Sequence, residues 1–403
     1  MPTTNSLITT LQNSTTFHMS LGSKELFHSN FLHWLSIIDW DAFLQIMRDF
    51  ANVKSFWWEN GCTLPGYKNN YCPQNDNLEV RREHHSFDLS IYILVEENTK
   101  NGKTSQKWIP VLILENKVKS IPYKGQLDEY EKKAKEEWRK KDWLPGRDIT
   151  FILLSLWKGT LPDQACQGWN HNSYEDLANL MSNLQFTNKK PLDQDIITDY
   201  IGFINALSQL ANNSWKLQKG MTWDEVYPWK TTKYSGDQYV KLRIHDLWEK
   251  IHYEQLLSML MGELQNKGIY VTQDKDEYQN QSNSKPPVVY CASNYAHNIG
   301  IFEAWVKKGN DDYIIQVQGD TYCRGFICKK APTKMIAAYF KRNNPQLQFH
   351  LKDDNALTFY TYKDKNPKKH MYYSKAEIEQ GMKISEVLDA ICDDIQDIVK
   401  NKP

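Results

Sequence analysis

The sequence lacks several features that would assign it to a specialised class of protein. It contains seven cysteines among 403 residues, and none of them forms a Cys-x-x-Cys pair. An odd, scattered set of thiols argues against a disulfide framework or a zinc site and favours a reduced, cytoplasmic protein. No apolar run approaches the length of a membrane span, so we expect no membrane partner. The first residues also lack the basic and then apolar pattern of a secretory signal.

The chain also lacks an excess of charge of either sign. It has 49 basic and 49 acidic residues, so any contact with nucleic acid must come from a local patch and not from an overall positive field. No internal repeat is visible. The length allows two or three domains with sizeable cores.

Two apolar segments carry charged residues where a buried strand would have none. Residues 87–94 and 111–117 are rich in β-branched and aromatic residues, and each is predicted to be a strand. Asp88 interrupts the first, and Glu115 and Lys117 interrupt the second. Side chains alternate along a strand, so Glu115 and Lys117 share one face. Asp88 reaches the same point if the two strands pair through the polar turn between them.

Carboxylates at strand positions are costly to bury unless a partner or a metal ion compensates them. Two acidic oxygens and one ammonium group around a shared point suit a Mg²⁺-assisted attack of water on a phosphodiester. The alternative is structural. Asp88 or Glu115 can form an ion pair with Lys117 at the end of a sheet, with no catalytic role.

The order of these residues resembles the PD-(D/E)xK nuclease superfamily. Asp88 and the Glu-Asn-Lys of 115–117 match its central motif, although Phe87 stands where the superfamily's name has proline. Residues 79–83 precede the Asp strand with two glutamates, and residues 126–130 follow the lysine as Gln-Leu-x-x-Tyr.

The layout is similar to that of one branch of these nucleases, which has the pattern E…D…ENK…QLxxY. Residues 25–35 resemble the N-terminal helix of that branch. The resemblance covers roughly residues 20–160 and says little about the remainder of the chain.

The resemblance implies roles for the central residues. Asp88 and Glu115 would bind Mg²⁺, with Mn²⁺ as a substitute, and the backbone carbonyl of Asn116 would complete the ligand set. Lys117 would position the attacking water or stabilise the transition state with its charge.

Four further residues are candidates for supporting roles at the same site. Gln126 and Tyr130 lie four residues apart on one helix face, although Tyr130 is equally suited to the core with its hydroxyl at the rim. Glu25 could supply a further carboxylate or simply interact with the N-terminus of its helix. Glu83, just before the Asp strand, is a comparable candidate.

The predicted fold is α/β, or α+β over the whole chain. Residues 20–160 are expected to form a restriction-endonuclease-like αβββαβ core, a mixed sheet flanked by helices with one parallel pair. Residues 161–271 are expected to form a helical region packed on that core. Residues 288–403 are expected to form a smaller α+β domain of unknown role. In that domain we expect strands at 288–294, 299–308, 312–318 and 356–363, and helices at 333–342 and 385–400.

The sequence therefore predicts a Mg²⁺-dependent endo- or exonuclease that acts on nucleic acid, with DNA as the first choice. The alternative is a catalytically silent nuclease-like module that binds nucleic acid or protein. Domains of this kind serve in restriction, phage defence or repair, and the resemblance leaves open a homodimer or a partner protein from a defence system.

Overall fold

The structure consists of two compact units, Met1–Ser214 and Trp215–Pro403. It is a computed structural model that describes residues 2–20, 24–59, 62–63, 70–71, 77–98, 104–118, 126–137, 148–156, 168–227, 236–281, 287–296, 299–308, 311–328, 358–362 and 369–400. Both units combine helices with strands, which confirms the predicted fold class.

The first unit is built on a five-stranded sheet in the order β3-β4-β5-β6-β7. Its strands are β3 (Leu78–His84), β4 (Phe87–Asn98), β5 (Thr104–Lys117), β6 (Thr150–Ser155) and β7 (Asn170–Ser173). The pairs β3–β4 and β4–β5 are antiparallel, whereas β5–β6 and β6–β7 are parallel. The predicted mixed sheet is therefore present, and α5 (Gln126–Glu137) lies in the crossover between the parallel strands β5 and β6.

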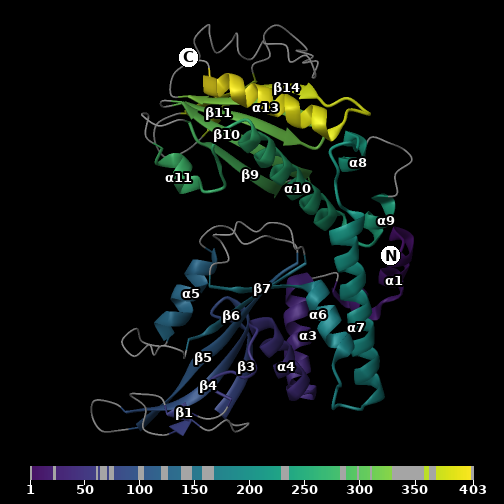
Figure 1. Ribbon diagram of the computed structural model, residues 1–403, viewed down its shortest axis with the longest axis vertical. Helices are drawn as coiled ribbons and strands as arrows, with labels where there is room; N and C mark the ends of the chain where they lie inside the picture. Colours follow the sequence, from purple (N-terminus) through teal and green to yellow (C-terminus); the bar gives the residue numbers. More distant parts are fainter. Residues whose placement is uncertain are drawn as a thin grey trace. The chain divides into compact units, whose positions relative to one another are not determined.

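Helices cover both faces of this sheet, with α5 on the opposite side from α3 and α4 (Figure 1). The helices of this unit are α1 (Thr4–Asn13), α2 (Thr15–Ser20), α3 (Lys24–Ile38), α4 (Trp40–Ala51), α5, α6 (Tyr174–Asn183) and α7 (Pro191–Gln209), which continues as the π-helix η2 (Leu210–Ser214). The short strands β1 (Cys62–Thr63) and β2 (Asn70–Tyr71) form a separate pair.

Strand β5 is the central strand of the sheet and positions the candidate site. Every residue from Ile109 to Val118 is buried, because neighbouring strands flank β5 on both edges and helices cover its faces. A strand in this position is expected to be apolar throughout. The charged side chains of Glu115 and Lys117 are therefore carried into the interior by the strand that holds them.

The second unit is a seven-stranded sheet in the order β13-β14-β12-β11-β10-β9-β8. Its strands are β8 (Val271–Thr272), β9 (Val289–Ala296), β10 (Ile299–Lys308), β11 (Asp311–Gln318), β12 (Thr321–Cys328), β13 (Thr358–Tyr362) and β14 (Lys369–Glu377). Only the β8–β9 pair is parallel among the described strands of this sheet. The helices are α8 (Trp223–Val226), α9 (Gly236–Lys241), α10 (His245–Asn266), α11 (Lys275–Gln279) and α13 (Ile384–Lys400).

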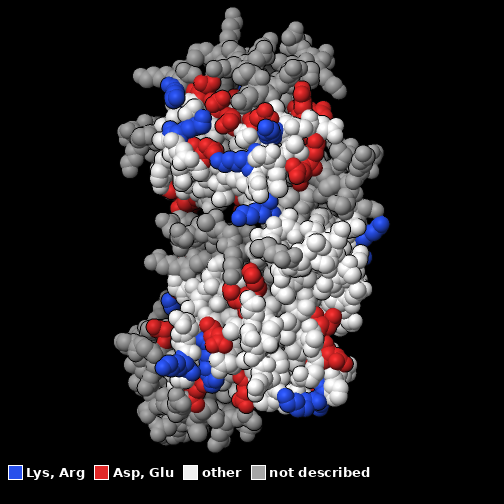
Figure 2. Space-filling model, turned by 45° about the vertical axis from the view of Figure 1, so that its right-hand side comes forward, with Lys and Arg blue, Asp and Glu red and all other residues white. Residues whose placement is uncertain are grey.

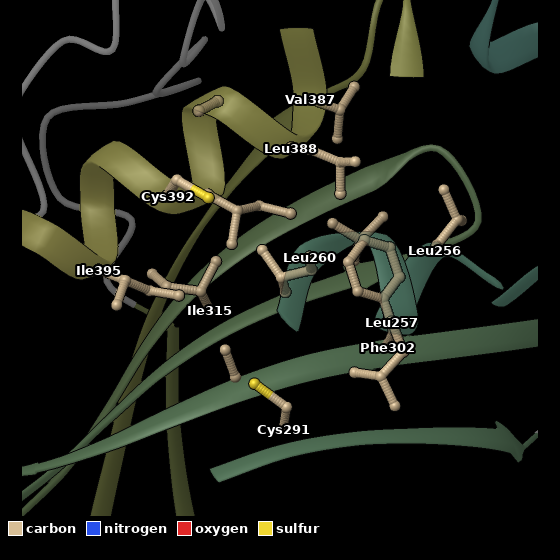
Figure 3. Packing of buried hydrophobic residues seen from close by; sticks show 14 of the residues in the cluster. Leu256, Leu257, Leu260, Cys291, Phe302, Ile315, Val387, Leu388, Cys392 and Ile395 are labelled. Atoms are coloured by element: carbon tan, nitrogen blue, oxygen red, sulfur yellow. The ribbon is translucent and has the colours of Figure 1, made fainter. Parts of the chain in front are cut away.

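Two long helices, α10 and α13, close the core of this second unit. Leu256 and Leu260 of α10 and Leu388 of α13 belong to one buried cluster with Phe302 and Ile315 of the sheet (Figure 3). Alternate residues of β10 are buried, as expected for a strand with only one face against the helices.

The structure divides the helical region expected over 161–271 between the two units. Helices α6 and α7 belong to the first unit, whereas α10 packs on β9 and β10 of the second. The first unit also extends beyond the expected range 20–160, because α1 and α2 pack on α7.

The four strands predicted between 288 and 363 are present as β9, β10, β11 and β13, and the helix predicted over 385–400 is present as α13. Strands β12 and β14 were not predicted, and the helix expected at 333–342 lies outside the described residues.

None of the described helices combines the length and the apolar character needed to cross a membrane. On the face of the molecule in Figure 2, the described acidic and basic side chains are mixed and do not gather into a patch of one sign.

Candidate active site

Asp88, Glu115 and Lys117 lie together at the ends of β4 and β5. Leu89 is paired with Leu114, so the next position on each strand brings Asp88 beside Glu115. The Asp88 carboxylate accepts a hydrogen bond from the backbone N–H of Asn116 at 2.6 Å. The ammonium group of Lys117 lies 2.7 Å from Oε1 of Glu115. The structure thus brings together the three ionisable side chains that strand alternation and pairing predicted to converge.

The electrostatics of this cluster are unbalanced toward negative charge. Burial raises the pKa of Asp88 to about 6, against the hydrogen bond from the Asn116 N–H and the charge of Lys117. Burial, followed by the charge of Asp88, raises the pKa of Glu115 to about 8. Burial lowers the pKa of Lys117, but the charge and hydrogen bond of the Glu115 carboxylate raise it by more. The pKa of Lys117 therefore lies above its ordinary value. One ammonium group does not offset the carboxylates around it, and the cluster favours an added proton or cation.

The donor chemistry of the cluster fits a hard divalent cation. The second carboxylate oxygen of Glu115, Oε2, is buried and has no hydrogen-bond partner, which is costly for a charged group. A cation bound beside Asp88 and Glu115 would satisfy it, and carboxylate oxygens are the ligands that Mg²⁺ prefers. Among the described residues, no group of three or more His, Cys, Asp or Glu side chains could hold a metal ion. The backbone carbonyl of Asn116 is a further candidate ligand beside the two carboxylates.

The backbone carbonyl of Asn116 is directed toward this point. The carbonyl of the following residue, Lys117, accepts a hydrogen bond from Leu156 just beyond β6. Successive carbonyls of an extended strand point to opposite sides, so that of Asn116 faces β4 and Asp88. This orientation agrees with the ligand set that the family resemblance implied.

Two of the predicted supporting residues act electrostatically on the cluster, a third is affected by its charge, and the fourth contacts the third. The charge of Glu25, in the first turn of α3, raises the pKa of both Asp88 and Glu115. Glu83 is exposed and raises the pKa of Asp88 alone.

Tyr130 of α5, on the opposite side of the sheet from α3, is affected electrostatically by the same carboxylates. Burial raises the pKa of its hydroxyl, and the charge of Glu115 adds to the effect. That hydroxyl accepts a hydrogen bond from Gln126 at 3.0 Å. The two residues therefore form one polar pair at the rim of the cluster, as their spacing of four predicted.

Sequence reasoning missed the side chains that hold Asn116 in place. The Asn116 amide donates to the Ser29 hydroxyl of α3 at 2.6 Å, and the Tyr174 hydroxyl of α6 donates to the Asn116 oxygen at 3.3 Å. All three side chains are buried. Ser29 lies four residues after Glu25, on the same face of α3, which is the one local signal that could have indicated it. No pattern in the sequence connects Tyr174 to this site.

Comparison with known proteins identifies the first unit. Residues 15–202 match the model of a family described as the PD-(D/E)XK nuclease superfamily. Neither a search of curated proteins nor a search of solved structures gave a match. Members of this superfamily are generally nucleases, which act on nucleic acid and typically use divalent metal ions. The matched range contains the whole five-stranded sheet and the site described above, and this part of the chain belongs to the PD-(D/E)XK nuclease superfamily.

Proposed function

We propose that this protein is a Mg²⁺-dependent nuclease that hydrolyses phosphodiester bonds of DNA at the Asp88–Glu115–Lys117 cluster. The observation that carries the proposal is the partnerless, buried Oε2 of Glu115 beside a second carboxylate. A purely structural ion pair would leave no reason to bury a second negative charge next to it. DNA as the substrate, and a role in phage defence, rest on the family resemblance.

In this proposal Asp88 and Glu115 would hold the cation through their oxygens, together with the carbonyl of Asn116. A divalent cation supplies positive charge at the scissile phosphate and makes nearby water more acidic. The hydrogen bond from the Asn116 N–H orients the Asp88 carboxylate through one oxygen, and the other oxygen would be the one to bind a cation. Mn²⁺ should replace Mg²⁺ because both ions accept oxygen ligands.

Lys117 acts on the reacting groups. Its ammonium group is oriented by Glu115 and buried, so its charge is screened little by water. From this position it holds the attacking water or stabilises the negative charge that develops on the phosphate. Four further residues are proposed to support the site. Glu25 and Glu83 would add negative charge near the carboxylates, and Gln126 and Tyr130 would brace the site or contact the nucleic-acid backbone.

The test compares wild type with Lys117→Ala on plasmid DNA and on labelled DNA and RNA oligonucleotides, in Mg²⁺, in Mn²⁺ and in EDTA. Wild type should cleave DNA with either cation and should be inactive in EDTA. Lys117→Ala should lose about 10²–10³-fold in rate, the usual cost of removing one group that stabilises the transition state.

The matched control is Lys219→Ala, which removes a lysine that forms an ion pair with Glu263 in the second unit. It should cleave at the wild-type rate. If wild type and Lys117→Ala gave the same result in the cleavage assay, whatever the cation, the remaining hypothesis would be a catalytically silent module that binds nucleic acid or protein. Cleavage of RNA in place of DNA would correct the substrate and keep the mechanism.

A further inference from the structure

The sheet face that carries the candidate active site continues beyond it across two more strands. Ser155 of β6 is paired with Lys117 of β5 in the parallel ladder. Paired residues on neighbouring strands point to the same face, at a strand spacing of about 4.8 Å. The Ser155 hydroxyl is therefore the next polar group after Lys117 along this edge of the sheet.

Ser155 in turn orients a histidine on the following strand. His171 of β7 is paired with Leu153, two positions before Ser155, so it shares the same face. The Ser155 hydroxyl lies 2.7 Å from Nε2 of His171. Ser155 is buried, whereas His171 is exposed. A buried hydroxyl thus fixes an imidazole that solvent can reach.

The place of this pair in the fold is one where ligands bind. Closer to the strand beginnings, the same face is apolar, with the rings of Phe151 and Trp169 5.0 Å apart and Lys135 of α5 above Phe151 at 6.0 Å. Among the described residues of this face, Lys117 and Ser155 lie at the carboxyl ends of β5 and β6, and His171 lies on β7. In open sheets with parallel strands, ligands bind outside these carboxyl ends.

We propose that His171, oriented by Ser155, binds a phosphate of the substrate strand next to the one that is cleaved. The strand would then run across the ends of β5, β6 and β7, from Lys117 toward β7. When the Ser155 hydroxyl donates to Nε2, the imidazole carries its proton on Nδ1, and an N–H at that nitrogen suits a phosphate oxygen. Contacts of this kind position a nucleic acid without reading its sequence. The inference rests on the proposed nuclease function and adds a binding residue and a direction for the substrate.

The experiment measures binding and cleavage separately for wild type, His171→Ala, His171→Gln and Ser155→Ala. Binding is followed by the anisotropy of a fluorescein-labelled DNA duplex in EDTA, and cleavage by KM and kcat in Mg²⁺. His171→Ala should raise Kd and KM about tenfold, for every sequence tested, and leave kcat nearly unchanged. Ser155→Ala should have a smaller effect in the same direction. His171→Gln, which keeps an N–H donor, should restore part of the binding.

The control is His18→Ala, which removes another exposed histidine of the same unit, hydrogen-bonded to the Gln12 carbonyl at the end of α1. It should bind and cleave as wild type does. Unchanged Kd and KM in His171→Ala, or a fall in kcat alone, would overturn the proposal, as would failure of His171→Gln to bind better than His171→Ala. A wild type that binds DNA but does not cleave it would refute the nuclease function and still leave the effect of His171 on binding measurable.

Discussion

Among the described residues, each unit contains a buried cluster of charged side chains, and the two clusters differ in how their charges are balanced. In the second unit, Asp394 of α13 and Arg324 of β12 form a two-pronged pair, with Nε 2.6 Å from one carboxylate oxygen and Nη2 2.7 Å from the other. The Tyr322 hydroxyl donates to the same carboxylate at 2.5 Å. One positive charge meets one negative charge, and both carboxylate oxygens accept hydrogen bonds.

The cluster of the first unit has a surplus of acid around a single lysine. Its carboxyl pKa values are raised to about 6 and about 8, and one oxygen of Glu115 has no partner. Buried charge that serves only the fold is expected to be paired and hydrogen-bonded. The Arg324–Asp394 pair connects a helix to a sheet, whereas the surplus of acid in the Asp88–Glu115–Lys117 cluster supports the proposal that this cluster receives a cation.

Breaking the balanced pair should have the largest effect, and on stability. Asp394→Asn removes the carboxylate charge that pairs with the buried Arg324, so we expect a loss of about 3–5 kcal/mol in the free energy of unfolding. Urea denaturation of the full chain measures it. The matched control is Asp393→Asn, since Asp393 is more than half exposed and lies 3.7 Å from Lys267, and a surface pair of this kind contributes about 0–1 kcal/mol. Equal losses in the two variants would contradict a structural role for Asp394.

Adding a divalent cation should raise the stability of the protein through the Asp88–Glu115–Lys117 cluster and not through the Arg324–Asp394 pair. Mg²⁺ or Mn²⁺ at about 100 times its Kd should stabilise wild type by about 2.7 kcal/mol, because it binds the folded state alone. Glu115→Gln should lose this gain, since it replaces the oxygen that has no partner with an amide. Asp393→Asn should keep it. Thermal unfolding with and without the cation measures the effect, and a gain that survives in Glu115→Gln would place the cation elsewhere.

The candidate site was predictable from the sequence where it depends on local rules. Side-chain alternation places Glu115 and Lys117 on one face, and a hairpin between neighbouring strands brings Asp88 to them. The partners of the Asn116 side chain were not predictable, because Ser29 and Tyr174 come from helices far away in the sequence and reach Asn116 only through packing.

The second unit shows where such local rules fail. Strand β12 has an arginine and a glycine next to one another in its interior, which hides the period of a strand. That arginine is Arg324, which lies opposite Asp394 of α13 and forms a buried ion pair with it. The sequence likewise predicts a helical region over 161–271 without indicating which sheet each helix covers, and the structure places α6 and α7 in the first unit and α10 in the second.

Lowering the pH should reduce the stability of both units, whereas adding a cation should stabilise the protein through the first unit alone. Burial lowers the pKa of His28 in the first unit and of His252 in the second to about 3. Each histidine is neutral when folded and takes up a proton when unfolded, so stability is present above the ordinary pKa of 6.5 and is lost as pH falls below it. At pH 5 the loss should be about 2 kcal/mol for each histidine.

Urea denaturation at pH 7 and at pH 5 tests this expectation with His28→Leu. The variant should lose less stability between the two pH values than wild type does. His18→Leu, at an exposed histidine, should behave as wild type. An identical pH dependence in wild type and His28→Leu would show that His28 takes up a proton in the folded protein.

The smallest expected change concerns the hydrogen bonds that hold Asn116. Ser29→Ala removes the acceptor for the buried Asn116 amide and should lower the free energy of unfolding by about 1 kcal/mol. Ser36→Ala is the matched control, because its buried hydroxyl bonds only to the His33 carbonyl within the same helix. The two variants should differ little in stability but clearly in cleavage.

The reason for this difference in cleavage is the connection between Asn116 and the carboxylates. The backbone N–H of Asn116 fixes Asp88, and its neighbours in the strand are Glu115 and Lys117. A small shift of this strand displaces the groups proposed to hold the cation, so kcat should fall about tenfold in Ser29→Ala, equivalent to about 1.4 kcal/mol in the barrier. In Ser36→Ala kcat should not change. If both variants cleaved at the wild-type rate, the positions of Asp88, Glu115 and Lys117 would not depend on the hydrogen bond between Asn116 and Ser29. That bond would then stabilise the fold alone, as the Arg324–Asp394 pair does.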